Sequence, residues 1–234
     1  MMWGTSIFFA GLIFAQNQEE VNKMSENLHW LGHSSFRFDG SKIIYFDPWK
    51  LPKNSKKADL VFISHEHFDH FSPEDVSAIS SSETVIISDR SVRGLLEGKI
   101  NSKEVEGLNP GETIEISGVK IQAVASYNIG KEFHSKDSRT LGFIVTIDGI
   151  TIYHAGDTDT IPQMKDYRCD IALLPVSGTY VMTADEAAEA ALAIKPKIAV
   201  PMHYGDIVGS PADAERFKEL LKGKIEVKIL KPEK

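Results

Sequence analysis

The stretch SHEHFDHF, at positions 64–71, gathers side chains of the types that bind metals. Three of the chain's eight histidines, His65, His67 and His70, lie there together with Asp69. Side chains alternate in an extended segment, so His65 and His67 point the same way and can share one metal ion. Asp69 and His70 stand where the chain bends toward a helix, so they can aim at a second point. The spacing therefore predicts two adjacent metal positions, and the alternative is a solvated polar loop.

The identity of the metal depends on the atoms that can bind it. Cys169 is the only cysteine, so neither a disulfide within the chain nor a cluster of thiolates can form. Nitrogen and oxygen ligands suit zinc, or manganese or iron where the site is richer in oxygen. We therefore expect two divalent metal ions as cofactors, with zinc favoured, and we expect Cys169 to be a small buried residue.

The elements that must position these side chains are short β-rich runs separated by turn signals. After Met24 the runs are HWLG, SFRF, KIIYF, LVFIS, TVIIS, TIEIS, KIQAVA, GFIVTI, TIYHA, IALLPV, KIAVP and KIEVKIL. Four helices are expected: three begin at caps on Ser72, Thr183 and Ser210, and one spans SDRSVRGLLEG. No fixed repeat or low-complexity linker interrupts them. Residues 24–234 are therefore expected to form one α/β domain.

Ligand-type side chains recur where the predicted strands end. LVFIS runs into His65, TIYHAG into Asp157 and KIAVPM into His203. In layered α/β proteins, sites form where loops leave the carboxyl ends of strands. Three separate strands that end in such residues predict one common site.

The motifs resemble those of a known family. SHEHFDHF resembles the signature of the metallo-β-lactamase fold. WLGHSSF, FDPW, YHAGDTD, LLPVSGTY and PMHYG appear in the order expected of its ascorbate-6-phosphate-lactonase-like branch of metal-dependent hydrolases. The resemblance covers roughly Leu28 to the end of the chain. It implies a four-layer αββα sandwich with a two-metal site at one edge.

The resemblance also implies which residues bind each metal. It places His65 and His67 at the first metal. It places Asp69, His70 and His203 at the second, with Asp157 as a bridge between the two.

The third histidine of the first metal is where the chain departs from the family pattern. Tyr127 and Asn128 stand at the expected place after KIQAVAS, and the next histidine is His134, in GKEFHSKD. Gly130 allows the sharp backbone turn that a returning loop requires. We therefore predict His134 as the third ligand. The alternative is that His134 is a surface residue and that water completes the first metal.

Of four other polar residues, three have both a functional and a structural interpretation. His33 either lines the site or stabilises a turn. Asp47, in FDPW, is expected to orient a ligand histidine through its free N–H, the alternative being a simple Asp-Pro turn. His154, three residues before Asp157, either lies close to the site or packs within its strand. His29 is expected to be structural.

The expected chemistry is hydrolysis. No Gly-x-Ser-x-Gly motif or other activated serine is present, so the expected nucleophile is a hydroxide held between the metals. Asp157 would orient it, and Asp69 or His154 would transfer protons. This chemistry serves lactones, esters, amides and phosphodiesters equally, and the resemblance alone favours a small lactone, ester or phosphorylated substrate. The alternatives are a phosphodiesterase or nuclease, and a metal-binding protein without turnover.

Composition limits which classes of binding partner and which cellular compartment are expected. The formal net charge of −7 argues against a nucleic acid as the main partner, so we expect a small-molecule substrate. The apolar part of residues 1–23 is too short to span a membrane. It is either a signal peptide cleaved near Ala15 or a leader upstream of the true start at Met24, and we favour the latter. A start at Met24 implies a cytoplasmic protein; the oligomeric state stays open, a homo-oligomer included.

Overall fold

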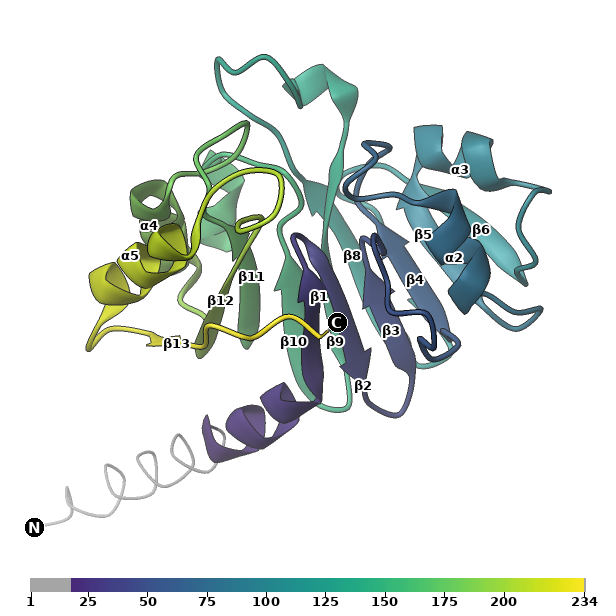
Figure 1. Cartoon of the computed structure of the whole chain (residues 1–234), viewed down its shortest axis with the longest axis horizontal. Coiled ribbons are helices and arrows are strands. Elements are labelled where there is room, and N and C mark those ends of the chain that lie inside the picture. The colour runs from purple at the N-terminus through teal and green to yellow at the C-terminus, as the bar shows by residue number, and fades with distance from the viewer. Residues whose placement is uncertain (1–17, 234) are drawn as a thin grey trace, which may run out of the picture.

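The computed structural model describes residues 18–233, which form two β-sheets packed face to face (Figure 1). The first sheet has six strands that lie side by side in chain order. They are β1 Leu28–Gly32, β2 Ser35–Asp39, β3 Ile43–Phe46, β4 Leu60–Ile63, β5 Val85–Asp89 and β6 Glu104–Leu108. The strands from β1 to β3 pair antiparallel, and those from β3 to β6 pair parallel.

The second sheet has seven strands, in the order β13-β12-β11-β10-β9-β8-β7. They are β7 Thr113–Ile116, β8 Val119–Ala125, β9 Leu141–Ile147, β10 Ile150–His154, β11 Ile171–Pro175, β12 Ile198–Met202 and β13 Glu226–Val227. The strands from β7 to β10 pair antiparallel, and those from β10 to β13 pair parallel. Each sheet therefore combines an antiparallel part with a parallel part.

Helices cover the outer faces of both sheets (Figure 1). Besides the helical residues 18–24, the α-helices are α2 Pro73–Ile79, α3 Arg90–Leu96, α4 Ala184–Ile194 and α5 Pro211–Leu221. Short 3-10 helices span Ser25–Asn27, Lys136–Ser138 and Pro162–Asp166. The helices α2 and α3 pack on the first sheet, and α4 and α5 pack on the second. The layer order is helix, sheet, sheet, helix, which confirms the predicted αββα sandwich.

Strand periodicity divides the core into two regions. Ile44 and Phe46 on β3, and Phe62 on β4, point into the space between the sheets. Tyr45 and Val61, at the alternate positions, point outward and pack under α2 and α3. Both sets are fully buried, as expected for strands that are covered on both faces.

The predicted helix starts are present. The Ser72 hydroxyl accepts a hydrogen bond from a backbone N–H of the first turn of α2, at 3.2 Å. Thr183 and Glu186 form the predicted capping box at α4. The Asp213 carboxylate accepts from the backbone N–H of Ser210 at 2.7 Å, at the start of α5.

Two strand predictions were incomplete. β6 was not expected, because Glu104, Glu106 and Gly107 interrupt any apolar run there. It lies at the edge of its sheet, where charged side chains can face water. The run KIEVKIL forms only the two-residue strand Glu226–Val227, since it too pairs along one edge alone.

Residues 18–23, directly before Met24, contact the domain. Residues 18–24 are helical, Val21 is buried in the main core, and Met24 packs against that core. Residues 1–17 of the predicted leader lie outside the described part of the chain, so the start at Met24 stays a prediction. Within residues 18–233, no helix is long and apolar enough to cross a membrane.

Candidate metal centre

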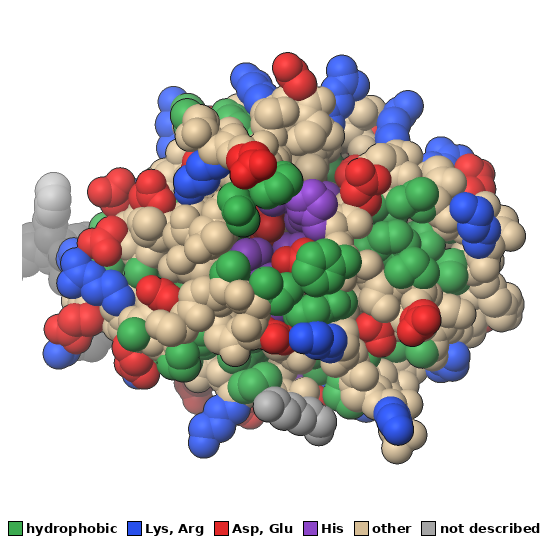
Figure 2. All heavy atoms as spheres, turned by 45° about the horizontal axis from the view of Figure 1, so that its top comes forward, with side chains coloured by type: hydrophobic (Ala, Val, Ile, Leu, Met, Phe, Trp, Pro, Cys, Tyr) green, Lys and Arg blue, Asp and Glu red, His purple; other side chains and the backbone are tan. Residues whose placement is uncertain are grey.

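The loops that follow β4, β10 and β12 meet at one edge of the sandwich. His65 follows β4 in the first sheet, whereas Asp157 and His203 follow β10 and β12 in the second. The carboxyl ends of these strands deliver the three side chains to one hollow. Figure 2 shows histidines at the bottom of that hollow. The structure therefore brings together the strand ends that the sequence singled out.

His65, His67 and His134 form the first group of converging nitrogens. His65 Nε2 lies 3.1 Å from His67 Nδ1, and His134 Nε2 lies 3.2 Å and 3.0 Å from these two atoms. Nitrogens bound to zinc at about 2.0–2.1 Å and tetrahedral angles lie roughly 3.3 Å from one another. The three distances thus fit one tetrahedral ion with a fourth position left open.

Asn128 closes the loop that carries His134. This loop joins β8 to β9, and the Asn128 N–H donates to the His134 carbonyl at 2.7 Å. The Asn128 side-chain amide donates to the carbonyls of Phe133, at 3.1 Å, and of Tyr180. The residue that stands where the family pattern places a histidine therefore fixes the loop that supplies one from farther along.

A buried carboxylate ties the same loop to the second sheet. Asp159 accepts a hydrogen bond from the Ile129 N–H at 2.7 Å and forms an ion pair with Lys131 Nζ. Lys131 Nζ also donates to the Val181 carbonyl at 2.6 Å. We call Asp159 and Lys131 the loop latch, because together they join the His134 loop to two neighbouring segments.

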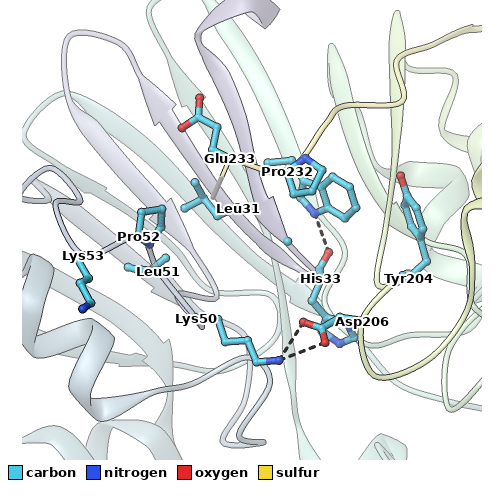
Figure 3. A pocket seen from close by; sticks show the side chains of 13 residues that line it. Leu31, His33, Lys50, Leu51, Pro52, Lys53, Tyr204, Asp206, Pro232 and Glu233 are labelled. Atoms are coloured by element: carbon cyan, nitrogen blue, oxygen red, sulfur yellow. Dashed lines mark hydrogen bonds and ion pairs between the residues drawn. The ribbon is translucent and has the colours of Figure 1, made fainter.

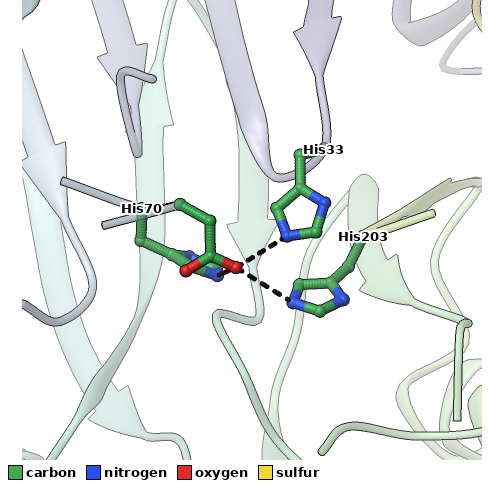
Figure 4. Close-up of side chains that lie close together, drawn as sticks. His33, His70 and His203 are labelled. Atoms are coloured by element: carbon green, nitrogen blue, oxygen red, sulfur yellow. Dashed lines mark hydrogen bonds and ion pairs between the residues drawn. The ribbon is translucent and has the colours of Figure 1, made fainter. Parts of the chain in front are cut away.

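His33, Asp69, His70 and His203 form the second group (Figure 4). Asp69 Oδ2 lies 3.0 Å from His33 Nε2, 3.9 Å from His70 Nε2 and 4.0 Å from His203 Nε2. The sequence predicted three of these residues as ligands. Of the two interpretations of His33, the structure favours the one that places it in the site.

Asp157 lies between the two groups. Its Oδ1 is 3.1 Å from His70 Nε2, and its Oδ2 is 3.2 Å from His203 Nε2. Oδ2 also lies 3.8 Å from His134 Nε2 and 4.0 Å from His65 Nε2. One carboxylate therefore faces both groups, which is the position that a bridging ligand requires.

Asp47, together with Ser64, orients histidines of both groups through the Nδ1 atoms that face away from the centre. Its Oδ2 lies 2.7 Å from His70 Nδ1 and accepts from the Ser64 hydroxyl, also at 2.7 Å. Its Oδ1 accepts from the Ser64 N–H at 2.7 Å, and Ser64 Oγ lies 2.9 Å from His65 Nδ1. On the opposite side, Ser177 Oγ lies 3.1 Å from His203 Nδ1. These contacts leave Nε2 of each ring directed at the centre.

Three of the side-chain atoms that face the centre, His70 Nε2, His203 Nε2 and Asp157 Oδ1, are buried and make no hydrogen bond within the described chain. The Asp157 carboxylate faces the two nitrogens at 3.1 Å and 3.2 Å, as an ion-pair partner only. An unpaired buried polar atom is destabilising, typically by about 1–3 kcal/mol. Because imidazole nitrogens and carboxylate oxygens are metal ligands, divalent ions fit these positions.

Buried charges shift the pKa values of the central pair. Burial alone would raise the pKa of Asp157, but His203 and His70 hold it well below its usual range. Burial alone would lower the pKa of His70, but Asp157 and Asp47 raise it well above its usual value. The pair is thus held as a carboxylate with a compensating positive partner, a role that a metal ion can take over.

The other ligand candidates are held in the form that binds metals. Burial, and then repulsion from His70, keep the pKa of His65 well below its usual value. Burial lowers the pKa of His134 to about 4. Burial would raise the pKa of Asp69, but the hydrogen bond from His33 brings it to about 2. Near neutral pH these are two uncharged imidazoles and one carboxylate.

Several site residues have a left-handed backbone. The φ angles of His33, Asp47, His134 and His203 are 50°, 43°, 59° and 59°. Non-glycine residues rarely adopt this region, and such residues cluster at functional sites. The loops therefore turn sharply at the residues whose side chains face or support the centre.

Two histidines lie outside the centre. His154 is fully buried: its Nε2 lies 2.9 Å from the Ser34 carbonyl, and its Nδ1 accepts from the Gly156 N–H at 3.3 Å. Its ring stacks on Phe46, so its contacts favour the packed-strand interpretation over proton transfer. His29, expected to be structural, lies 2.6 Å from a Glu233 carboxylate oxygen at the surface.

Two cavities flank this edge of the sandwich. A cavity of about 250 Å³ opens over the metal groups. It is lined by His67, Phe68, Asp69, Phe133, His134, Asp157, Tyr180, His203, Ile207 and Val208. A larger one, of about 550 Å³, lies on the other side of His33, between Trp30, Lys50 and Tyr204 (Figure 3). The smaller of these two cavities is lined by ligand candidates of both groups.

Some residues of the site were within quoted motifs but had no predicted role. Ser64 belongs to SHEHFDHF, Asp159 to YHAGDTD, and Ser177 and Tyr180 to LLPVSGTY. Only the motif membership signalled them, because their contacts join segments far apart in the chain. Lys131 stands in the quoted stretch GKEFHSKD, also without a predicted role, and the cavity residue Ile207 lies outside every quoted motif.

Comparison with known proteins identifies the family. Residues 27–203 match the model of the beta-lactamase superfamily domain. A UPF0173 metal-dependent hydrolase of Pyrococcus abyssi is 36% identical over 217 residues, which cover 87% of this chain and 95% of that protein. A protein of the same name from Thermoplasma acidophilum is also 36% identical, over 222 residues, with 89% and 96% covered.

Solved structures agree with this match. A protein from Parabacteroides distasonis, named as a candidate metal-dependent hydrolase, is 35% identical with a TM-score of 0.76, and 87% of this chain and 93% of that one are covered. The metallo hydrolase Igni18 of Ignicoccus hospitalis is 25% identical with a TM-score of 0.73, at 88% and 95% coverage. None of the proteins cited here is named a lactonase, so the ascorbate-6-phosphate-lactonase-like branch stays a prediction. The chain belongs to the metallo-β-lactamase superfamily and, within it, to the UPF0173 metal-dependent hydrolases.

Proposed function

We propose that the chain binds two divalent metal ions, one at each ligand group, and hydrolyses a small ester or lactone. The observation that supports this most is the position of Asp157, whose Oδ2 lies within 4.0 Å of nitrogens from both groups. Zinc is the proposed ion for the first group, since its three ligands are imidazoles. The second group includes a carboxylate and also suits manganese or iron.

The two ions would supply a water activated near neutral pH and would polarise the substrate carbonyl. The protein supplies the geometry. Asp47 and Ser64 fix the ring orientations of His65 and His70, so that their Nε2 atoms stay directed at the centre. Asp69 lines the cavity as a carboxylate and is positioned to accept a hydrogen bond from the attacking water. The low pKa of Asp69 keeps it ready for this role across the neutral range.

The test measures metal content and turnover separately. After reconstitution with zinc, manganese or iron, elemental analysis should give close to two ions per chain, and Asp157→Asn should lower that number. The reconstituted protein is then screened against esters, lactones, phosphodiesters and RNA. The exposed helix-α5 variant Glu219→Gln serves as a control with unchanged metal content.

Each alternative has its own outcome in this screen. Turnover of phosphodiesters or RNA alone would establish the nuclease alternative. Two bound metals without any turnover would establish the non-catalytic one. Absence of bound metal after reconstitution would overturn the proposal entirely.

A further inference from the structure

The cavity over the metal groups has a hydrophobic rim. Among residues 18–233, seven large hydrophobic side chains are exposed, and four of them line this cavity. They are Phe68, Phe133, Tyr180 and Ile207. Figure 2 shows hydrophobic side chains around the hollow that contains the histidines. Exposed apolar side chains that cluster around a polar site commonly mark a ligand-binding surface.

The rim is held in place by ring contacts. Phe133 meets Tyr180 edge to face, with centroids 4.8 Å apart, and meets the His67 ring at 5.7 Å. On the opposite side Phe68 packs edge to face against Trp49 at 6.1 Å. Edge-to-face pairs are a favoured aromatic geometry. The aromatic walls are therefore positioned next to the ligand atoms in advance of any substrate.

No cation lines this cavity among the described residues. Apart from the histidines and aspartates of the two metal groups, its lining side chains are the apolar and aromatic ones. Lys131 nearby is engaged by Asp159 and the Val181 carbonyl, and Lys50 forms an ion pair with Asp206 at 3.0 Å. A phosphate or second carboxylate on the part of the substrate that lies away from the metal groups would thus enter an apolar rim without a partner, which is unfavourable.

We propose that the cavity binds the uncharged, apolar part of its substrate, so that the substrate class is an ester or lactone with an alkyl or aryl chain. This inference rests on the proposed function, and it disfavours the phosphorylated substrates that family resemblance suggested. In the reaction, water adds its oxygen to the acyl carbon and the acyl C–O bond breaks. One proton of the water passes to the departing alkoxide oxygen and the other is released to solvent, which leaves an alcohol and a carboxylate. The alkyl or aryl chain of the substrate stays between Phe68, Phe133 and Ile207 throughout the reaction. A cavity of about 250 Å³ suits a compact molecule.

The first experiment measures binding without turnover. Calorimetry on the metal-loaded full chain compares acetate, butyrate and hexanoate, the carboxylate products of such esters. Affinity should rise about fourfold for each added methylene, as expected for burial of a CH₂ group. Adipate, which matches hexanoate in length but ends in a second charge, should bind at least tenfold more weakly than hexanoate. Affinity that is independent of chain length, or adipate binding equal to hexanoate binding, would overturn the inference.

Variants of Ile207 test whether the rim causes the preference. Ile207 lies in the loop after β12 and is not adjacent in sequence to a ligand candidate. Ile207→Ser should reduce the ratio of hexanoate to acetate affinity severalfold, and Ile207→Lys should shift the preference toward adipate. Leu95 on α3 is as exposed as Ile207, so Leu95→Ser is the matched control and should keep the wild-type ratio. Unchanged ratios in both Ile207 variants would contradict the assignment of the rim.

Turnover separates this inference from the proposed function. The same chain-length series is assayed as ethyl esters with the reconstituted protein. Chain-length-dependent binding without hydrolysis would overturn the proposed function but not the apolar site. Hydrolysis with no preference for apolar chains would overturn the inference and leave the hydrolase proposal standing.

Discussion

The ligand candidates after β4 and the ligand candidate His134 are held by different parts of the fold. His65 and His70 follow a buried strand, and the fully buried pair Asp47 and Ser64 fixes their rings. His134 comes from the loop between β8 and β9, which is held by polar contacts of Asn128 and of the loop latch. His65 and His70 therefore depend on the core, and His134 depends on a few polar contacts of one loop.

The strand-borne ligands and the loop-borne ligand His134 should therefore separate from the metal by different motions. Strand-borne ligands separate only when the sandwich itself opens, whereas a loop can open locally at a lower free energy. The ion at His65, His67 and His134 should therefore be lost before the domain unfolds. Four sets of variants test that contrast, from the largest expected effect to the smallest.

Asp47→Ala is expected to have the largest effect. It removes the carboxylate that accepts hydrogen bonds from the N–H and hydroxyl of Ser64 and that contacts His70 Nδ1. All of these groups are buried. Leaving several buried donors unpaired should lower the free energy of unfolding by about 3–5 kcal/mol. Urea denaturation of the metal-free protein measures this without a contribution from metal binding.

Asp47→Asn is the matched control for that variant. Asparagine keeps one acceptor and tolerates the φ of 43°, so its stability should lie between wild type and Asp47→Ala. Wild-type stability of Asp47→Ala would show that the buried contacts of Asp47 do not hold His65 and His70 in place.

His134→Asn should remove one metal ion and leave the fold intact. Asparagine keeps the left-handed backbone but lacks the ring nitrogen directed at His65. His70→Asn, in contrast, should lose the other ion and also destabilise the domain. Elemental analysis and thermal melts of the two variants measure the contrast.

Tyr127→Phe is the control for the loop variants. It removes only the hydrogen bond from the Tyr127 hydroxyl to Gln163, at 3.2 Å, and should keep both metals. Full metal content in His134→Asn would show that His134 is not a ligand.

Breaking the loop latch should weaken the first ion without removing a ligand. Asp159→Asn or Lys131→Met should reduce its affinity about 10–100-fold, a typical effect of supporting residues. The affinity of the second ion should change far less. Competition with a chromogenic chelator measures the two affinities, and Glu219→Gln provides the control for loss of an acidic residue.

The double variant Asp159→Asn, Lys131→Met sharpens this result. If the two residues act as one latch, their combined effect should be close to that of either variant alone. Fully additive effects would mean that they support the loop independently.

Ser177→Ala should have the smallest effect. Its hydroxyl is a neutral partner of His203, whereas Asp47 is a charged partner of His70. Charge-assisted hydrogen bonds are roughly twice as strong as neutral ones. The affinity for the second ion should therefore fall by about tenfold or less. A larger loss than that of Asp159→Asn would reverse the expected order.

Residues that follow strands could be predicted from sequence, because strand periodicity and spacing determine where they point. His65, His67, Asp157 and His203 all fall in this class, and the structure brings them together. His134 required a loop conformation, and Gly130, with φ at +73°, supports the turn that was expected. The loop latch could not be predicted, since Asp159 and Lys131 are 28 residues apart and meet only in the folded chain.

Strand β6 and the roles of His33 and His154 were also hard to predict, because they depend on how segments of the chain pack in the folded domain. β6 carries glutamates on an otherwise short run, and it becomes a strand only by pairing with β5. His33 had two interpretations because its contact with Asp69 spans 36 positions of the chain. His154 lies close to Asp157 in sequence, but strand alternation directs its ring into the core, where backbone groups use both nitrogens.

The left-handed backbone at the centre restricts how its ligands can change during evolution. In many metal sites, cysteine, glutamate or aspartate can replace histidine over time while the metal is kept. At His33, His134 and His203 an exchange to cysteine or glutamate would carry a backbone penalty of roughly 1–2 kcal/mol before any effect on the metal. Asparagine, aspartate and glycine are the replacements that a left-handed backbone tolerates best, and of these only aspartate is a strong metal ligand. The backbone conformation at these three positions therefore narrows the exchanges that would keep both the fold and the ion to aspartate.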